Sequence, residues 1–139
     1  MPDTFQLEIV TPEKKVVETP AEEIQIPGRN GYLGIMPGHA PLITELAVGE
    51  ITFHANGHDE RLAVAWGFAE VLPDKVTILA ETAEMAEEID IERARAAKER
   101  AEKRLRSPDP EMDLNRVTVA LERALIRLQV ASRRQYLEK

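Results

Sequence analysis

Residues 78–106 read ILAETAEMAEEIDIERARAAKERAEKRLR, and the character of the sequence changes within this stretch. The region before it holds all seven glycines and all three histidines of the 139-residue chain. From residue 85 to residue 106 there is no glycine or proline, and the helix-favouring residues Ala, Glu, Arg and Lys predominate. Net charge changes at the same place, from −9 over residues 1–84 to +2 over residues 85–139. We therefore expect a domain boundary here, with a β domain over 1–84 and a helical domain over 85–139.

The part before this boundary has the pattern of short β-strands. Residues 5–9, FQLEI, alternate apolar and polar side chains, and this period of two is typical of a strand with one buried face. Turn signals such as Asn56-Gly57 separate further aliphatic runs, and Gly34 and Gly38 lie in turns that we expect to need positive φ. The spacing predicts an antiparallel β-sandwich or barrel, and pattern alone does not separate a sandwich from a jelly roll.

The part after the boundary predicts two helices. The Gly- and Pro-free residues 85–106 favour the first helix, with Asp90 as its N-cap or as an acid in its first turn. The helix should stop at Ser107-Pro108-Asp109-Pro110. Asp113 can cap the second, which should run to about Tyr136, and the short link predicts an antiparallel hairpin. The expected contact stripes are Ala94, Ala97, Ala101 and Leu105 on the first helix and Leu114, Val117, Leu121, Leu125, Leu128 and Ala131 on the second. Because alanine buries little apolar area, at roughly 25 cal/mol per Å², we expect a weakly held hairpin that can open.

Composition excludes several classes of function. Without cysteine there are no disulfides, zinc–thiolate sites or cysteine nucleophiles. Serine occurs only at Ser107 and Ser132, both in the helical part, so a Ser-His-Asp enzyme is not expected. His54 and His58 surround a predicted turn without the carboxylates of a metal site, so we interpret them as surface histidines. A net charge of −7 argues against nucleic-acid binding, and no stretch approaches the ~20 apolar residues of a membrane span.

The arginines of the helical part form a candidate anion-binding set. The set comprises Arg93, Arg100 and Arg104 on the first predicted helix and Arg123 and Arg127 on the second. A folded hairpin could bring the two groups together, and guanidinium groups beside an acid such as Asp90 suit an anionic nucleotide. Spacing alone leaves two alternatives open: a solvated face with ion pairs such as Glu99–Lys103, and a docking site for an acidic protein surface.

Residues 31–42, GYLGIMPGHAPL, resemble the signature segment of the epsilon subunit of bacterial-type F-type ATP synthases. The resemblance covers essentially the whole chain, including the opening strand FQLEIVTPEKKV (5–16), the run ILAETAE (78–84) and the two charged helices. It implies an α+β fold in which an N-terminal antiparallel β-sandwich is followed by a C-terminal two-helix antiparallel hairpin. It also implies a non-catalytic subunit of the rotating central stalk.

The same resemblance implies partners. The sandwich would bind the gamma subunit and rest on the ring of c subunits, on the cytoplasmic side of the cell membrane, in a proton- or sodium-translocating enzyme. Candidate contacts are Arg29, Tyr32, Gly34, Pro37, His39 and Pro41. Tyr32 stands where some members carry an acid, so we assign it no salt bridge to the ring. Extended, the helices would inhibit ATP hydrolysis by meeting the catalytic beta and alpha subunits through Arg116, Arg123, Arg127, Arg133 and Arg134.

A second motif concerns ATP as a regulatory ligand. Some members bind ATP in the folded hairpin through Ile or Leu, Asp, two variable residues, Arg and Ala, and residues 89–94 of this chain read IDIERA. The full implied set is Glu84, Ile89, Asp90, Arg93, Ala94, Arg100, Arg123 and Arg127. ATP would stabilise the folded hairpin there and would not be hydrolysed. The alternative is a free-standing nucleotide-responsive sensor, which would not form a stoichiometric complex with gamma.

Overall fold

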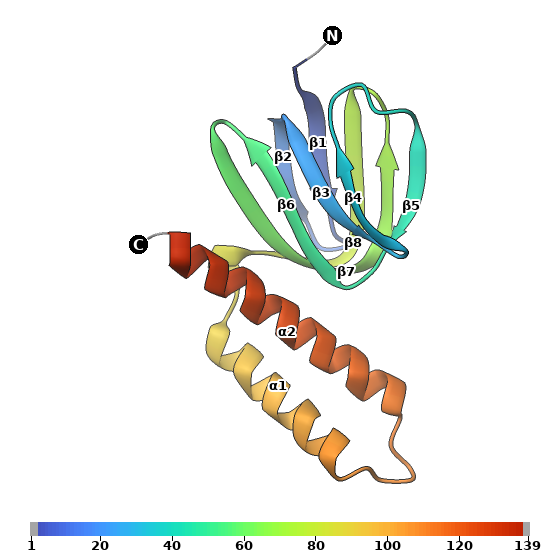
Figure 1. Cartoon of the computed structure of the whole chain (residues 1–139), viewed down its shortest axis with the longest axis vertical. Helices are drawn as coiled ribbons and strands as arrows, with labels where there is room; N and C mark the ends of the chain where they lie inside the picture. Colours follow the sequence, from blue (N-terminus) through green and yellow to red (C-terminus); the bar gives the residue numbers. More distant parts are fainter. Residues whose placement is uncertain (1–2, 138–139) are drawn as a thin grey trace. The chain divides into compact units, whose positions relative to one another are not determined.

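A computed structural model describes residues 3–137, with side chains up to Ser132. Its contacts divide the chain into two compact units, one ending at Met85 and the other beginning at Ala86. The first is a β-sandwich and the second a pair of helices (Figure 1), so the predicted fold class is confirmed. The eight strands are β1 (Phe5–Val10), β2 (Lys15–Ala21), β3 (Glu23–Gly28), β4 (Gly31–Ile35), β5 (Leu42–Leu46), β6 (Gly49–Ala55), β7 (His58–Val71) and β8 (Lys75–Met85).

One long strand, β7, takes part in both layers of the sandwich. Its first half pairs with β6 and its second half with β5, while β8 follows it on the other side. The chain bends between these halves at Trp66 and Gly67, whose φ angles are 58° and 123°. The strand order is β2-β1-β8-β7-β5-β3-β4, with β6 between β3 and β7, and among the described strands only β1 and β8 pair in parallel.

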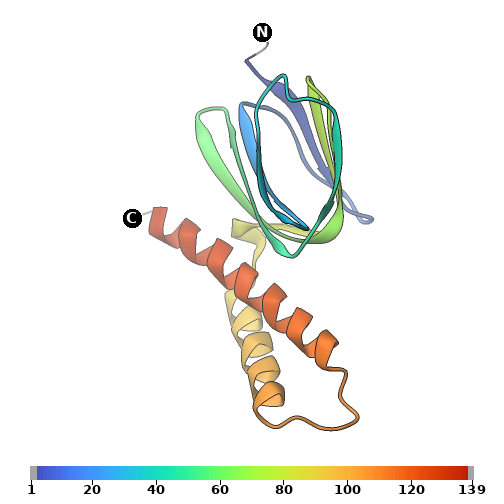
Figure 2. The ribbon, with the colours of Figure 1, turned by 45° about the vertical axis from the view of Figure 1, so that its right-hand side comes forward.

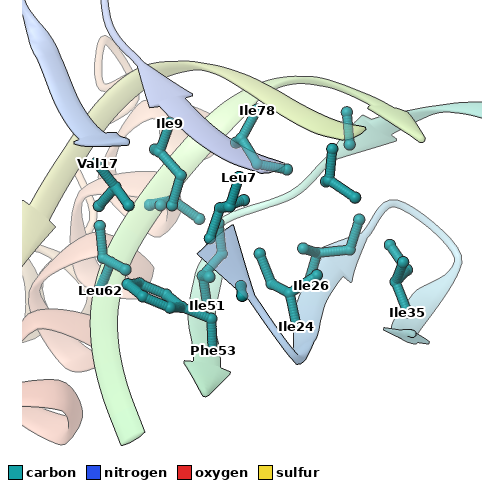
Figure 3. Packing of buried hydrophobic residues seen from close by; sticks show 14 of the residues in the cluster. Leu7, Ile9, Val17, Ile24, Ile26, Ile35, Ile51, Phe53, Leu62 and Ile78 are labelled. Atoms are coloured by element: carbon teal, nitrogen blue, oxygen red, sulfur yellow. The ribbon is translucent and has the colours of Figure 1, made fainter. Parts of the chain in front are cut away.

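The core lies between the two layers and is mostly aliphatic. Leu7 and Ile9 of β1 face Ile24 and Ile26 of β3 across it, and all four are almost completely buried (Figure 3). Burying each such side chain contributes about 1.5–3 kcal/mol relative to leaving it in water. The period-two alternation of residues 5–9 therefore sets which face of β1 points inward.

Two of the turn predictions are confirmed and one is wrong. Asn56 and Gly57 have φ angles of 55° and 79° and form the whole loop between β6 and β7, as in a type I′ hairpin. Gly38 has a φ of 86°. Gly34, by contrast, lies inside β4, where it pairs with Gln25 and has no positive φ. Regular strand pairing removes the need for left-handed backbone at that position.

The helical unit consists of a 3₁₀ turn η1 (Ala86–Glu88), α1 (Ile91–Arg106) and α2 (Leu114–Leu137), and Figure 2 shows both helices. The prediction that Asp90 stands at the start of the first helix is confirmed. Asp90 has extended backbone and its carboxylate accepts a hydrogen bond from the Arg93 N–H at 3.1 Å, so the helix begins after it. Asp113 caps α2 in the same way, through the Arg116 N–H at 3.2 Å.

Small residues dominate the buried positions of both helices. Ala94 and Ala101 are buried on α1, and Val117, Ala124, Val130 and Ala131 on α2. Leu114 and Leu125 were predicted in the contact stripe, but they are 58% and 44% exposed. At 100° per residue around the helix axis, Ala124 lies about 20° from the buried Val117, so it faces the same way. Leu125 lies about 80° from Val117 and therefore points away from the contact. Neither described helix has the length and apolarity needed to cross a bilayer.

Candidate functional site

The segment 29–42 runs through the β3–β4 turn, β4 and the link to β5. Arg29, Tyr32, Gly34 and Pro41 are exposed, and Pro37 and His39 are half-buried, so all six predicted contacts are accessible in the described chain. Two interactions anchor the segment. The Arg29 guanidinium lies 2.6 Å from the Glu45 carboxylate, and the Tyr32 hydroxyl accepts a 3.0 Å hydrogen bond from the Glu50 N–H.

Glu50 is itself held in place. It is 5% exposed, and its carboxylate lies 3.3 Å from the Arg61 guanidinium, which also donates to the Thr52 hydroxyl at 3.1 Å. A buried carboxylate needs such a partner, because an unpaired charge there would be strongly destabilising. Tyr32 therefore accepts its hydrogen bond from the backbone of Glu50 on β6, and the side chain of Glu50 is held by Arg61 on β7.

An apolar patch on the outward face of β5, β7 and β8 was missed from sequence. We define it as Ile43, Phe68 and Leu79, which are 70%, 52% and 54% exposed. Phe68 lies directly opposite Leu79 on β8 and opposite Glu45 on β5. The sequence signal was the consecutive pair Ile78-Leu79: neighbouring strand residues face opposite ways, so one of two adjacent apolar residues must point outward.

The residues implied for ATP fall into two roles in the structure. Ile89 and Ala94 are 8% and 2% exposed, so they pack, and Asp90 caps α1. Arg93 and Arg100 are exposed, and Arg123 and Arg127 are partly buried. Glu84 belongs to β8 in the other compact unit. The side chains of Arg133 and Arg134 lie outside the described residues.

Helix register decides which arginines share a level of the hairpin. A cleft between the helices is lined by Ala97 and Ala101 of α1 and by Val117 and Ala120 of α2, so these residues lie opposite one another. The helices are antiparallel, so moving about 10 Å from this cleft means going back seven residues on α1 and forward seven on α2. This step leads from Ala101 to Ala94 on α1, and from Val117 and Ala120 to Ala124 and Arg127 on α2. Arg93 therefore lies at the level of Arg123 and Arg127. Arg100 instead lines the cleft with Arg104 and Arg116.

His54 joins the β6–β7 hairpin to the start of β3. Its Nδ1 lies 2.8 Å from the Asp59 carboxylate and its Nε2 3.6 Å from that of Glu22. The hydrogen bond with Asp59, with the negative charges of Glu22, Asp59 and Glu23, raises the pKa of His54 above its ordinary 6.5 although partial burial opposes the shift. Within the described part of the chain, no three His, Asp or Glu side chains form a group that could hold a metal ion.

The His54 pair predicts a pH-dependent contribution to stability. Because the folded pKa is raised, the stabilisation is fully present below 6.5 and is lost as pH rises through the folded value. Asp59→Asn should therefore lower the free energy of unfolding more at about pH 6 than at about pH 9. Urea titrations at both pH values measure this, with Glu60→Gln as a control in the same hairpin. An equal loss at both pH values would contradict the prediction.

Comparisons with known proteins cover both units. The model of the family described as "ATP synthase, Delta/Epsilon chain, beta-sandwich domain" matches residues 4–86, and that described as "ATP synthase, Delta/Epsilon chain, long alpha-helix domain" matches residues 87–132. An ATP synthase epsilon chain of Koribacter versatilis is 67% identical over 111 residues, which cover 80% of this chain and 78% of the relative. One of Moorella thermoacetica is 50% identical over 129 residues, which cover 92% and 96%.

Solved structures agree with the sequence relatives. A chain in the cryo-EM structure of the Euglena gracilis mitochondrial ATP synthase, OSCP/F1/c-ring, is similar with a TM-score of 0.82 at 27% identity. That match covers 95% of this chain and 83% of the Euglena chain. A chain from the central stalk and c ring of the Tetrahymena thermophila mitochondrial enzyme, at 12% identity and a TM-score of 0.57, shares the fold.

Proposed function

Because the chain belongs to the family of bacterial-type ATP synthase epsilon subunits, we propose that it couples rotation of the c ring to ATP synthesis as part of the central stalk. It is a non-catalytic subunit of the rotary ATP synthase. In this proposal the sandwich stays fixed to gamma and to the c ring, peripherally on the cytoplasmic side of the cell membrane. The observation that carries the proposal is the apolar patch.

The composition of the patch supports gamma docking on this face. Contiguous exposed apolar side chains are unusual on a soluble surface unless a partner covers them. Acidic side chains surround the patch: Glu45 is opposite Phe68, Glu70 is opposite Ile43, and Glu81 follows on the same face of β8. The matching gamma surface would have an apolar centre with Lys and Arg around it.

Replacing Leu79 with glutamate should reduce co-purification with gamma at least tenfold, because it places a charge among apolar groups that binding would desolvate. The matched control is Leu114→Glu on α2, where the leucine is 58% exposed. Pull-down of gamma by the tagged chain measures the effect. Failure of the wild-type chain to hold gamma in stoichiometric amounts would favour the free-standing sensor instead.

The segment 29–42 is proposed to rest on the c ring. Arg29 and Tyr32 are exposed, yet each is tied to the sandwich by the contacts described above. A contact that carries rotation needs side chains that are accessible and held in position. The Arg29–Glu45 pair contributes only about 0–1 kcal/mol to stability, because both groups are exposed. Arg29 is thus available for a partner at little cost to the fold.

The helices are proposed to be the regulatory element. Packed together they would bind ATP, and extended they would meet the beta and alpha subunits and inhibit ATP hydrolysis. The alanine-rich buried positions support this proposal, because a pair that buries little apolar area needs little free energy to separate. A ligand that binds only the packed state stabilises it by its differential affinity.

ATP binding to the full chain should be saturable and should be lost in Arg123→Ala plus Arg127→Ala, because charge-assisted contacts to phosphate would disappear. Calorimetric titration measures the affinity. Arg95→Ala is the matched control, since Arg95 on α1 pairs with Glu92 at 3.0 Å and is not in the implied set. No heat at millimolar ATP would leave these arginines as protein-docking groups.

A further inference from the structure

The loop between β6 and β7 holds one of the two Asn-Gly pairs of the chain. It consists of Asn56 and Gly57 alone, and both residues are exposed. An asparagine side chain is short enough to reach the backbone of the residues that follow it, and Gly57 has no Cβ to stand in the way. The carboxamide carbon of Asn56 and the nitrogen of Gly57 are therefore placed to close a succinimide ring.

Both reacting groups are unengaged in the part of the chain that the structure describes. There the Asn56 carboxamide takes part in no hydrogen bond, and the Gly57 N–H donates to no backbone carbonyl. A Cβ placed on Gly57 would meet no atom within 4 Å, so there is room for a ring at the turn. The tip of this hairpin therefore offers neither a hydrogen bond nor a steric obstacle to the reaction.

The second Asn-Gly pair, Asn30 and Gly31, provides a comparison within the same fold. Gly31 belongs to β4 and pairs with Gly28 of β3, so its nitrogen lies in the sheet ladder. The glycine of the first pair lies in the loop, outside the ladder of β6 and β7. Attack by the Gly31 nitrogen first requires the end of the β3–β4 ladder to open, which slows the reaction at Asn30.

We propose that Asn56 is a site of spontaneous conversion to isoaspartate in the folded chain, and that the conversion opens the tip of the β6–β7 hairpin. The Gly57 nitrogen forms a bond to the Asn56 carboxamide carbon. The departing NH2 group takes up the proton of that nitrogen and leaves as ammonia. Water then opens the succinimide ring: cleavage at the former backbone carbonyl gives isoaspartate, and cleavage at the former side-chain carbonyl gives aspartate.

Isoaspartate changes the geometry of the loop. It adds a carbon atom to the backbone between β6 and β7, and it places a new carboxylate there. The present loop, with φ angles of 55° and 79°, closes the hairpin so that His54 stands opposite Asp59. A longer link does not keep this register, so the 2.8 Å contact between His54 and Asp59 is lost on conversion. The modification thus removes the ion pair that holds the end of the hairpin.

Ageing of the full chain in mildly alkaline buffer, followed by peptide mass spectrometry, tests the proposal. Trypsin releases residues 30–61 as one peptide, because no lysine or arginine lies between Arg29 and Arg61. Fragment ions of this peptide therefore compare the two asparagines in one measurement. The mass gain from exchange of NH2 for OH should accumulate about two to ten times faster at Asn56 than at Asn30, where a ladder hydrogen bond must break first. Asn56→Gln, whose longer side chain would close a larger ring, should show no gain at this position.

Two further measurements examine the product. Methyl transfer by a purified protein isoaspartate methyltransferase should label the aged chain, which separates isoaspartate from aspartate. Hydrogen exchange over residues 54–60 should be faster in the aged chain than in the fresh one. Asn56→Asp is the matched control, because it adds the charge without lengthening the backbone, and it should keep the protection of the fresh chain.

Three results would overturn the proposal. The first is an unconverted Asn56 in the folded chain under conditions that convert a synthetic peptide of residues 53–60 completely. The second is conversion of Asn30 as fast as that of Asn56. The third is an isoaspartate-containing chain whose hydrogen exchange over residues 54–60 equals that of Asn56→Asp, because the hairpin would then tolerate the longer backbone.

Discussion

Replacing Gly67 with alanine should destabilise the sandwich by about 3 kcal/mol or more, which is enough to prevent folding of a domain of ordinary stability. Its φ of 123° is unfavourable for any residue with a Cβ. The added carbon would also overlap the Leu79 carbonyl oxygen and lie 2.9 Å from the Ala80 Cα. Both clashes involve backbone of β8, which cannot move aside without breaking its pairing with β7. Urea denaturation of the full chain measures the loss.

Two other glycines separate the causes of this effect. Gly57→Ala meets no atom within 4 Å but keeps a φ of 79°, so it isolates the backbone cost of about 1 kcal/mol. Gly34→Ala meets neither obstacle, so we expect a change within about 0.5 kcal/mol. If Gly67→Ala were no worse than Gly57→Ala, close packing of β7 on β8 at this point would be disproved.

Removing the chain from Ser107 onward should raise ATP hydrolysis by the assembled enzyme while gamma binding persists. The truncation deletes α2 and with it Arg116, Arg123 and Arg127, which are the proposed contacts to the catalytic subunits. If the inhibitory extended state occupies half of the enzyme, hydrolysis should about double, and a larger rise indicates a larger inhibited fraction. Steady-state hydrolysis by the purified complex measures this.

A second truncation keeps the result interpretable. Ending the chain at Met85 removes both helices but leaves the sandwich with its own core, because all residues of the core cluster belong to that unit. We expect the same rise in hydrolysis as for truncation at Ser107. Unchanged hydrolysis in both truncated enzymes, with intact assembly, would end the inhibitory proposal for this chain.

Local chemistry made much of the fold predictable. The Asn56-Gly57 turn needs positive φ at two successive residues, and few other dipeptides adopt that conformation easily. Asp90 and Asp113 cap helices because a short carboxylate reaches the free N–H groups of the first turn. Each of these signals acts within about four residues, so no knowledge of the rest of the chain is required.

The errors and omissions involve distant parts of the chain. Gly34 is regular strand because Gln25 pairs with it, and the register of β3 on β4 cannot be read from either segment alone. Phe68 and Leu79 form a patch only once β7 and β8 are aligned. Leu125 was misplaced because, at 100° per residue, two steps of four residues rotate it about 80° from Val117. The cleft between α1 and α2 likewise depends on the register of the two helices. The predicted ATP and partner residues stay predictions.

The double membership of β7 has a mechanical consequence. A load applied at Phe68 passes along the covalent chain to Leu62 in the part of the strand that pairs with β6, without relying on side-chain packing. Under twisting the sandwich should therefore behave as one stiff body. The compliant elements are those with a single neighbour, β2 beside β1 and β4 beside β3. In a pulling experiment these two strands should detach first, and the pair β7–β8 last.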